Sequence, residues 1–186
     1  MRISDALKII QEELMNYDEL EDVVVDNLID STGPISHSGV VITLVKVDEE
    51  GALKNGKHHR LTQSYRVVFK NRLIYTNLYL LISSHGDYGA ALTNLSKVLE
   101  FFQGKNVFTH LDGTPSGAKI GENYKLIAEL QDFNFEQINY IWSIYGGAHK
   151  PSVFYKIRLV PHEAKDKQND EGDPILEVNV DGNTTY

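Results

Sequence analysis

The sequence contains no cysteine, which excludes a disulfide framework, a thiolate metal site and a cysteine nucleophile. It also has no apolar run near the roughly 20 residues that span a bilayer, and charged residues interrupt its first turns, unlike a secretory signal. The net charge of −8 disfavours nonspecific nucleic-acid binding, which needs a basic surface to neutralise phosphates. These absences predict a cytoplasmic protein with neither a membrane nor a nucleic acid as its partner.

The charges that are present lie unevenly along the chain. Residues 1–30 carry nine acidic against two basic residues, residues 31–162 carry ten against fourteen, and residues 163–186 carry seven against two. Within the basic middle, residues 51–72 hold six Lys or Arg and no acid. This basic segment is either an ordinary solvated loop and strand face or a seat for an acidic partner, such as an acidic terminus of another copy.

The length of 186 residues suits one domain, and hydrophobic periodicity divides it into helices and strands. Three helices are predicted, at residues 3–14, from the cap Asp87 to the stop at Gly104, and from the capping-box residue Asn134 to Gly146. Strands are predicted at residues 23–28, 39–47, 72–84, 106–110, 124–131 and 152–160. The strand at 39–47 is apolar on both faces, which predicts a central place in a sheet that is covered on both sides.

Apolar spacing also predicts which side chains each element buries. The predicted stripe of the second helix is Tyr88, Ala91, Leu92, Leu95, Leu99 and Phe102, and that of the third is Phe135, Ile138, Ile141 and Tyr145. Trp142 flanks the latter stripe, so it is either a core residue or an exposed interface anchor. One face of the strand predicted at 152–160 is expected to hold Val153, Tyr155, Ile157 and Leu159.

A composition change divides the chain into a compact domain, 1–161, and an acidic arm, 162–186. Residues 162–173 have one alanine as their only apolar residue, which predicts a mobile linker. Residues 174–180 (PILEVNV) then have the composition of a strand. Such a strand can add to a sheet edge of its own subunit or of a neighbour.

Three groups contain residue types that are found in catalytic or ligand-binding sites, but their order or spacing does not match such a site. GTPSGAKIG at 113–121 lacks the Gly-Lys-Ser/Thr order of a phosphate-binding loop. Residues 83–87 contain Ser, His and Asp, but without GxSxG they are better explained as a strand end and a helix cap. His58 and His59 face opposite ways on a strand and have no carboxylate cluster nearby. The sequence therefore predicts no catalytic, metal or cofactor site.

Three segments of the chain, taken in their order along the sequence, resemble those of a known protein family. They are VITLVKVDEEGALKN (41–55), YLLISSHGDYGAALTNLSKVLEFFQGKNVFT (79–109) and IWSIYGGAHKPSVFYKIRLVP (141–161). Together they resemble the tail-terminator, or cap, family of contractile injection systems. These are phage-tail-like particles that include the antifeeding prophage and the Photorhabdus virulence cassettes.

The resemblance implies an α+β fold: one domain with a mixed, mostly antiparallel sheet flanked by about three helices, plus a C-terminal arm. It implies a structural role, not an enzymatic one, as a hexameric ring at the end of the tail distal to the baseplate. There the ring would stop growth of the inner tube and hold the last ring of the sheath. The implied partners are other copies, the tube protein and the sheath protein, without a cofactor, assembling in the bacterial cytoplasm and then forming part of the particle.

The resemblance transfers few functional residues. Its most recognisable block matches Trp142, Gly146, Gly147, Pro151, Ser152 and Tyr155, for which we expect structural roles in a helix end, a tight turn and a strand. Candidate contacts with another copy or a partner are Lys54, Lys57, Arg60, Arg66, Ile175, Leu176, Val178 and Val180. Two other functions stay open: another tail component, either a tube initiator or a tail-completion adaptor, and a small hydrolase that uses His85 and Asp87.

Overall fold

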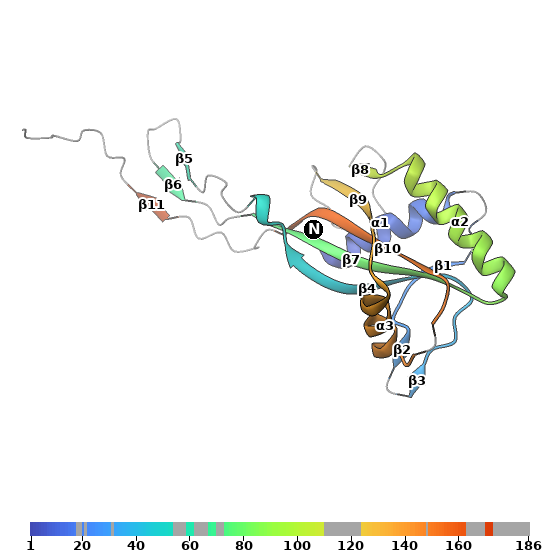
Figure 1. The fold of residues 1–186 in the computed structure, drawn as a ribbon. Helices are drawn as coiled ribbons and strands as arrows, with labels where there is room; N and C mark the ends of the chain where they lie inside the picture. Colours follow the sequence, from blue (N-terminus) through green and yellow to red (C-terminus); the bar gives the residue numbers. More distant parts are fainter. Residues whose placement is uncertain are drawn as a thin grey trace, which may run out of the picture.

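A computed structural model gives the fold shown in Figure 1. It describes residues 1–17, 20, 22–30, 32–53, 59–61, 67–69, 73–109, 124–147, 149–162 and 170–172, with backbone alone for 59–61, 67–69 and 170–172.

The body is built on one sheet of six strands in the order β1-β4-β7-β10-β9-β8. In chain order the strands are β1 (Val23–Val25), β4 (Gly39–Glu49), β7 (Ile74–His85), β8 (Val107–Thr109), β9 (Lys125–Gln131) and β10 (Ser152–His162). β1 is parallel to β4, and the other neighbours are all antiparallel. The predicted mixed, mostly antiparallel sheet is thus confirmed, as are the approximate positions of its strands.

The three predicted helices are also present, as α1 (Ile3–Met15), α2 (Tyr88–Gly104) and α3 (Phe135–Ile144). Their starts are fixed by local side-chain bonds. The Asp87 carboxylate accepts hydrogen bonds from the first backbone N–H groups of α2, and Asn134 and Gln137 form the reciprocal capping box of α3. Gly146 and Gly147, with φ of 82° and 75°, end the turn after α3, where other residues would be strained.

Helices cover both faces of the sheet and create two apolar clusters (Figure 1). The larger core lies between the sheet and the helices α1 and α2, with Ile10, Leu80 and Ile157 fully buried at its centre. The smaller core lies under α3 and consists of Leu28, Val41, Leu81, Trp142 and Phe154. The first half of β4 contributes to both cores, which confirms its predicted two-sided burial. Beyond Leu44, β4 becomes more exposed, and Val47 is 41% exposed.

The stripe predicted for α2 is only half right. Ala91, Leu95 and Phe102 are buried, but Tyr88, Leu92 and Leu99 are 68%, 45% and 38% exposed. The buried side of α2 instead includes Val98 and Phe101. Apolar residues occur around most of this helix, and its rotation is set by an aromatic cluster: Phe101, Phe102, Phe108 and Tyr155.

The stripe predicted for α3 is right for three of its four residues and wrong for Phe135. Trp142 is the buried residue of this helix, at 4% exposed, whereas Phe135 is 92% exposed. Ile138, Ile141 and Tyr145 are only partly buried against the smaller core. Because Trp has the largest apolar surface on α3, burying it favours this rotation over one that buries Phe135.

β10 departs from simple alternation at its end. A register shift follows Ile157, and Leu159 has a positive φ of 69°. This bulge turns Val160 into the core in place of the predicted Leu159. The strand then continues through Pro161 to His162, past the predicted boundary. Proline is tolerated there because, among the described residues, β9 pairs with β10 only as far as Arg158, so no described neighbouring strand on that side needs an N–H from Pro161.

Six short elements complete the described chain. β2 (Ile29–Asp30) and β3 (Gly33–Pro34) form a small ribbon where a turn was predicted. A 3₁₀ turn, η1 (Gly51–Leu53), follows β4. A second sheet, in the order β11-β6-β5, lies beyond the end of β4 in Figure 1 and consists of β5 (His59–Leu61), β6 (Val67–Phe69) and β11 (Asp170–Gly172). β11 falls inside the segment predicted as a linker.

Candidate assembly site

Residues 83–87 form the strand end and the helix cap that were predicted for them. Ser83 Oγ lies 2.9 Å from His85 Nε2, but Ser83 is fully buried at the end of β7, and Asp87 caps α2. Within the described ranges, no three His, Asp or Glu side chains group in a way that could hold a metal ion. None of the described helices is long and apolar enough to cross a membrane.

An open groove runs beside β4 where β1 stops. β1 pairs only with Val40, Val41 and Ile42, so the rest of β4 extends past it. The groove has a volume of about 450 Å³, and α1, β1, β4 and the end of α3 contribute to its wall. Six apolar residues dominate the lining: Leu7, Val25, Ile29, Ile42, Leu44 and Ile144. Ile144 is 67% exposed, so an apolar side chain stands in solvent at this groove.

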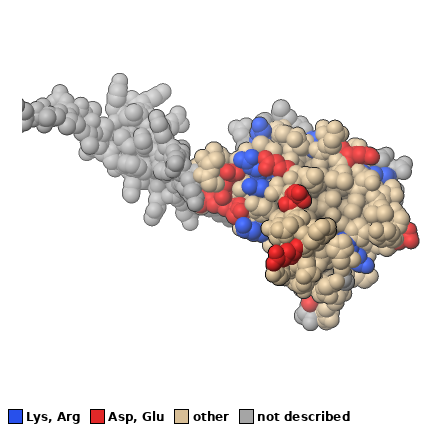
Figure 2. Space-filling view, in the orientation of Figure 1, with Lys and Arg blue, Asp and Glu red and all other residues tan. Residues whose placement is uncertain are grey.

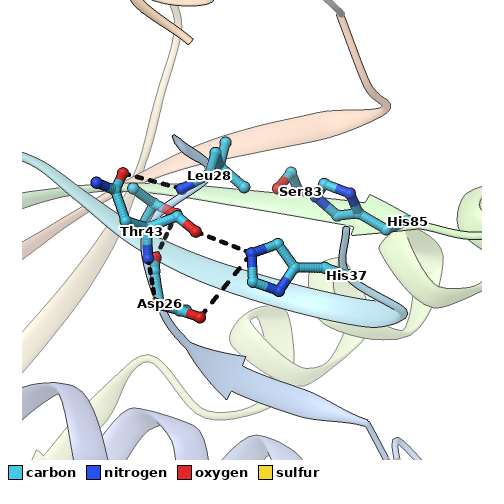
Figure 3. A network of polar contacts seen from close by, with 7 residues as sticks. Asp26, Leu28, His37, Thr43, Ser83 and His85 are labelled. Atoms are coloured by element: carbon cyan, nitrogen blue, oxygen red, sulfur yellow. Dashed lines mark hydrogen bonds and ion pairs between the residues drawn. The ribbon is translucent and has the colours of Figure 1, made fainter. Parts of the chain in front are cut away.

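A polar network fixes the chain that forms one wall of the groove (Figure 3). Thr43 Oγ1 donates to the Asp26 carbonyl oxygen at 2.8 Å, and the Asp26 N–H donates to the Ile42 carbonyl oxygen at 3.2 Å. His37 Nε2 lies 2.8 Å from the Asn27 carbonyl oxygen and 4.0 Å from the Asp26 carboxylate. The chain leaving β1 is therefore tied to β4 and to the segment before β4, which holds the groove open.

Two histidines meet at one end of this network. The rings of His37 and His85 are edge to face, with centroids 5.6 Å apart, as Figure 3 shows. Burial lowers the pKa of His85, and the nearby His37 and Lys150 lower it further. Burial also lowers the pKa of His162, with a smaller effect from the N-terminal ammonium group.

These shifts predict acid sensitivity. Both histidines have a folded-state pKa below the unfolded value of about 6.5, so below that pH the unfolded chain binds more protons than the folded chain. The free energy of unfolding should therefore fall as the pH is lowered from 7.5 to 5.5. Urea denaturation at several pH values would measure this slope.

The double variant His85→Asn, His162→Asn is the control for this prediction. Removing both titrating groups should flatten the slope between pH 7.5 and 5.5, even if the variant is less stable at every pH. A wild-type stability that does not change over this interval would contradict the assignment.

A second candidate surface lies on the face of the sheet that α3 packs against, in the part of that face that α3 does not cover. After Phe154 of the smaller core, alternate positions of β10 hold Lys156 and Arg158, so the same face turns from apolar to charged. Lys46 and Lys156 flank the Tyr79 ring, at 5.1 and 5.5 Å from its centroid. Figure 2 shows acidic and basic side chains intermingled at the left end of the body.

Arg158 is the centre of this charged surface. Its Nε donates to Glu50 Oε2 at 3.0 Å and its Nη1 to Glu129 Oε1 at 2.8 Å. Hydrogen bonds with Glu129 and Glu50 raise the pKa of Arg158. Burial by itself would raise the pKa of Glu50, but the Ala52 N–H and Arg158 outweigh it and lower that pKa. No local sequence pattern predicts this bridge, because Glu50 and Arg158 are 108 positions apart.

The residues of the family block lie at the end of α3, in the turn that follows it and in the first part of β10. Trp142 and Tyr155 are buried on opposite faces of the sheet, and Tyr155 stacks on Phe102 with ring centroids 4.1 Å apart. The Pro151 carbonyl oxygen accepts a hydrogen bond from Ser84 N–H, and Ser152 opens β10 opposite Ser83. Pro151 and Ser152 also line a second hollow of about 530 Å³ beside the exposed Tyr88.

Most of the predicted contact residues lie outside the residues that the structure describes. Arg60 lies in β5, of which only the backbone is described. The other members of that set lie outside the described residues: Lys54, Lys57, Arg66, Ile175, Leu176, Val178 and Val180. Their roles stay predictions. The residues of the groove were not among the candidates, because their neighbourhood depends on where β1 stops pairing.

Both the sequence and the fold of this chain are similar to those of known proteins. Residues 6–177 match the model of the Pvc16 N-terminal domain family. No curated protein matches the sequence. A sheath/tube terminator of the PVC extracellular contractile injection system, in its extended state, has the same fold over 100% of this chain, with a TM-score of 0.65 and 17% identity. The tube-terminating cap of the anti-feeding prophage matches 96% of this chain, with a TM-score of 0.65 and 13% identity. This chain spans 65% of the first of these proteins and 60% of the second.

Proposed function

Because this chain belongs to the Pvc16 N-terminal domain family, we propose that it is a structural terminator, which caps the tube and sheath of a contractile injection system. The observation that carries the proposal is the fold match to a sheath/tube terminator along the whole chain. The match to a tube-terminating cap supports the same role. The exposed groove and the charged surface are consistent with a protein whose work is to bind other proteins.

The terminator acts as a ring, which we propose is hexameric as the family resemblance implies. A polymer with a repeating docking surface grows until a component matches its end and presents no further copy of that surface. A closed ring of identical head-to-tail contacts achieves this with one kind of subunit. The tube protein and the sheath protein are then the partners of the two ring surfaces.

The charge distribution suggests how partners are recognised. The basic segment 51–72 follows β4 directly, at the end of the sheet where the charged surface lies. Lys54, Lys57, Arg60 and Arg66 are the proposed contacts of this segment with an acidic partner surface. The ring would assemble inside the bacterium and leave it as part of the particle, with no catalytic step and no cofactor.

Deletion of the gene tests the function directly. Without the terminator, tubes and sheaths should reach uncontrolled lengths, because nothing occupies their growing end. Negative-stain electron microscopy of particles from the deletion strain would show a broad length distribution, and the wild-type gene supplied in trans should restore a narrow one.

The position of the protein in the particle separates this function from a tube initiator. Gold or antibody labelling should place it at the end distal to the baseplate. Normal tail lengths in the deletion strain, or label at the baseplate, would refute the terminator role.

A further inference from the structure

One large apolar side chain stands almost fully in solvent. Phe135, the first residue of α3, is 92% exposed, more than any other large hydrophobic side chain in the described part of the chain. The capping box of Asn134 and Gln137 fixes the backbone that carries this ring. Asp132 and Glu136 flank it and are exposed. The start of α3 is therefore an aromatic knob, Phe135, beside two carboxylates.

The hollow beside Tyr88 has the complementary character. It has a volume of about 530 Å³, lies between the first turns of α2 and residues 149–152, and includes Leu92 and Leu95 in its lining. Tyr88 and Leu92 are 68% and 45% exposed, so apolar surface faces the solvent there. Lys150 supplies a positive charge, and none of the lining residues is acidic. A hollow of this size and polarity fits an aromatic ring that has acidic neighbours.

A subunit cannot fill this hollow with its own Phe135. α3 packs on the face of the sheet that holds the smaller core, whereas α2 packs on the opposite face, over the larger core (Figure 1). The caps of both helices fix their starts, and the Ser84 N–H donates to the Pro151 carbonyl oxygen at 3.0 Å, which ties the far wall of the hollow to β7. Knob and hollow are thus both preformed, and they can meet only between two copies.

We propose that Phe135 of one copy inserts into the hollow beside Tyr88 of the next copy. A second copy is favoured over a different protein because this chain itself presents both halves of the contact, matched in apolar character and in charge. A buried aromatic side chain removes roughly 150–250 Å² from water, and Asp132 and Glu136 would approach Lys150 at the rim.

The contact is head-to-tail, because the knob and the hollow are different surfaces of the subunit. Repetition of such a contact generates a ring when the rotation between neighbours closes. This assignment rests on the ring of the proposed function and names a contact that joins its subunits.

A photoreactive side chain at position 135 tests the contact without removing the ring. Purified particles with Phe135→para-azidophenylalanine in the full chain would be irradiated, and the products identified by mass spectrometry. We expect a product of twice the chain mass that joins position 135 to residues 84–95 or 149–152. The matched control is Tyr140→para-azidophenylalanine. Tyr140 is 61% exposed on the same helix but lies about 140° around it from Phe135, so its yield of this product should be at least fivefold lower.

Other products would identify other occupants. A link from position 135 to the same chain, to the tube or sheath protein, or to neither overturns the contact, as do equal yields from positions 135 and 140. Tail length and labelling in the same particles report the proposed function separately. Normal lengths and a distal position without the expected product would reject this contact and leave the terminator role intact.

Exchange of charges gives a second readout of the same product. Lys150→Glu should lower its yield at least threefold, because a carboxylate would then face Asp132 and Glu136. Adding Glu136→Lys to the same chain should restore the yield, since every contact then pairs the exchanged charges. Lys8→Glu is the control, because Lys8 is exposed on α1 and does not line the hollow. An unchanged yield with Lys150→Glu, or no recovery in the double variant, would contradict the pairing.

Discussion

Replacing Gly39 by alanine should strongly destabilise the domain. Gly39 has a φ of 68°, and a Cβ there would overlap the side chain and carbonyl oxygen of Asp22. The same carbonyl accepts a hydrogen bond from Val40 N–H at 2.7 Å, where β1 begins to pair with β4. Strain from positive φ costs about 1–2 kcal/mol, and separating the two chains adds the loss of their pairing. We expect the free energy of unfolding to fall by more than about 3 kcal/mol.

Gly86→Ala is the matched control for that experiment. Gly86 also has a positive φ, of 102°, but nothing lies within 4 Å of its Cβ position. It should therefore show the conformational strain alone, about 1–2 kcal/mol. Urea denaturation of both variants separates strain from overlap. Equal losses in the two variants would show that Asp22 does not limit the space at Gly39.

Replacing Phe102 by alanine should produce a comparably large loss. Phe102 is 4% exposed and its ring stacks on that of Tyr155 at a centroid distance of 4.1 Å. It also contacts the rings of Phe101 and Phe108 edge to face. Truncation of such a residue typically costs about 3–5 kcal/mol. For a chain of this length we expect the melting temperature to drop by about 10 °C, measured by circular dichroism.

Phe135→Ala supplies the same chemical change at an exposed position. Phe135 is 92% exposed at the start of α3, so its truncation should change the free energy of unfolding by less than about 0.5 kcal/mol. The sequence pattern by itself places both phenylalanines in apolar stripes. A large loss at Phe135 would restore the original prediction for α3, whereas a negligible loss at Phe102 would contradict the burial of that ring in the larger core.

Local signals in the sequence predicted the elements of this fold well. The capping box at Asn134 and Gln137, the cap at Asp87 and the glycine pair after α3 depend on residues a few positions apart, and the structure confirms each. Strand composition likewise located β4, β7 and β10. These signals work because the interactions that they report are made within one turn or one strand.

Other features depended on partners distant in the sequence. Half of the α2 stripe and Phe135 of the α3 stripe were mispredicted, and the place of Trp142 stayed open, because each helix has apolar residues on more than one side. Only the sheet beneath selects Phe101 over Leu99 or Trp142 over Phe135. The bulge that turns Val160 inward arises from pairing with β7. The bridge between Glu50 and Arg158 joins the residue after β4 to β10, and the sequence does not show these two segments to be near one another.

The sequence by itself determined the element types, the helix starts, the lack of thiol chemistry and, through three segments, the resemblance to the terminator family. Only the tertiary structure decided which side of each helix is buried, and that β1 stops short and leaves a groove beside β4. The physical reason is the range of the interactions: caps and periodicity act over a few residues, whereas burial and open strand edges depend on how the whole sheet assembles.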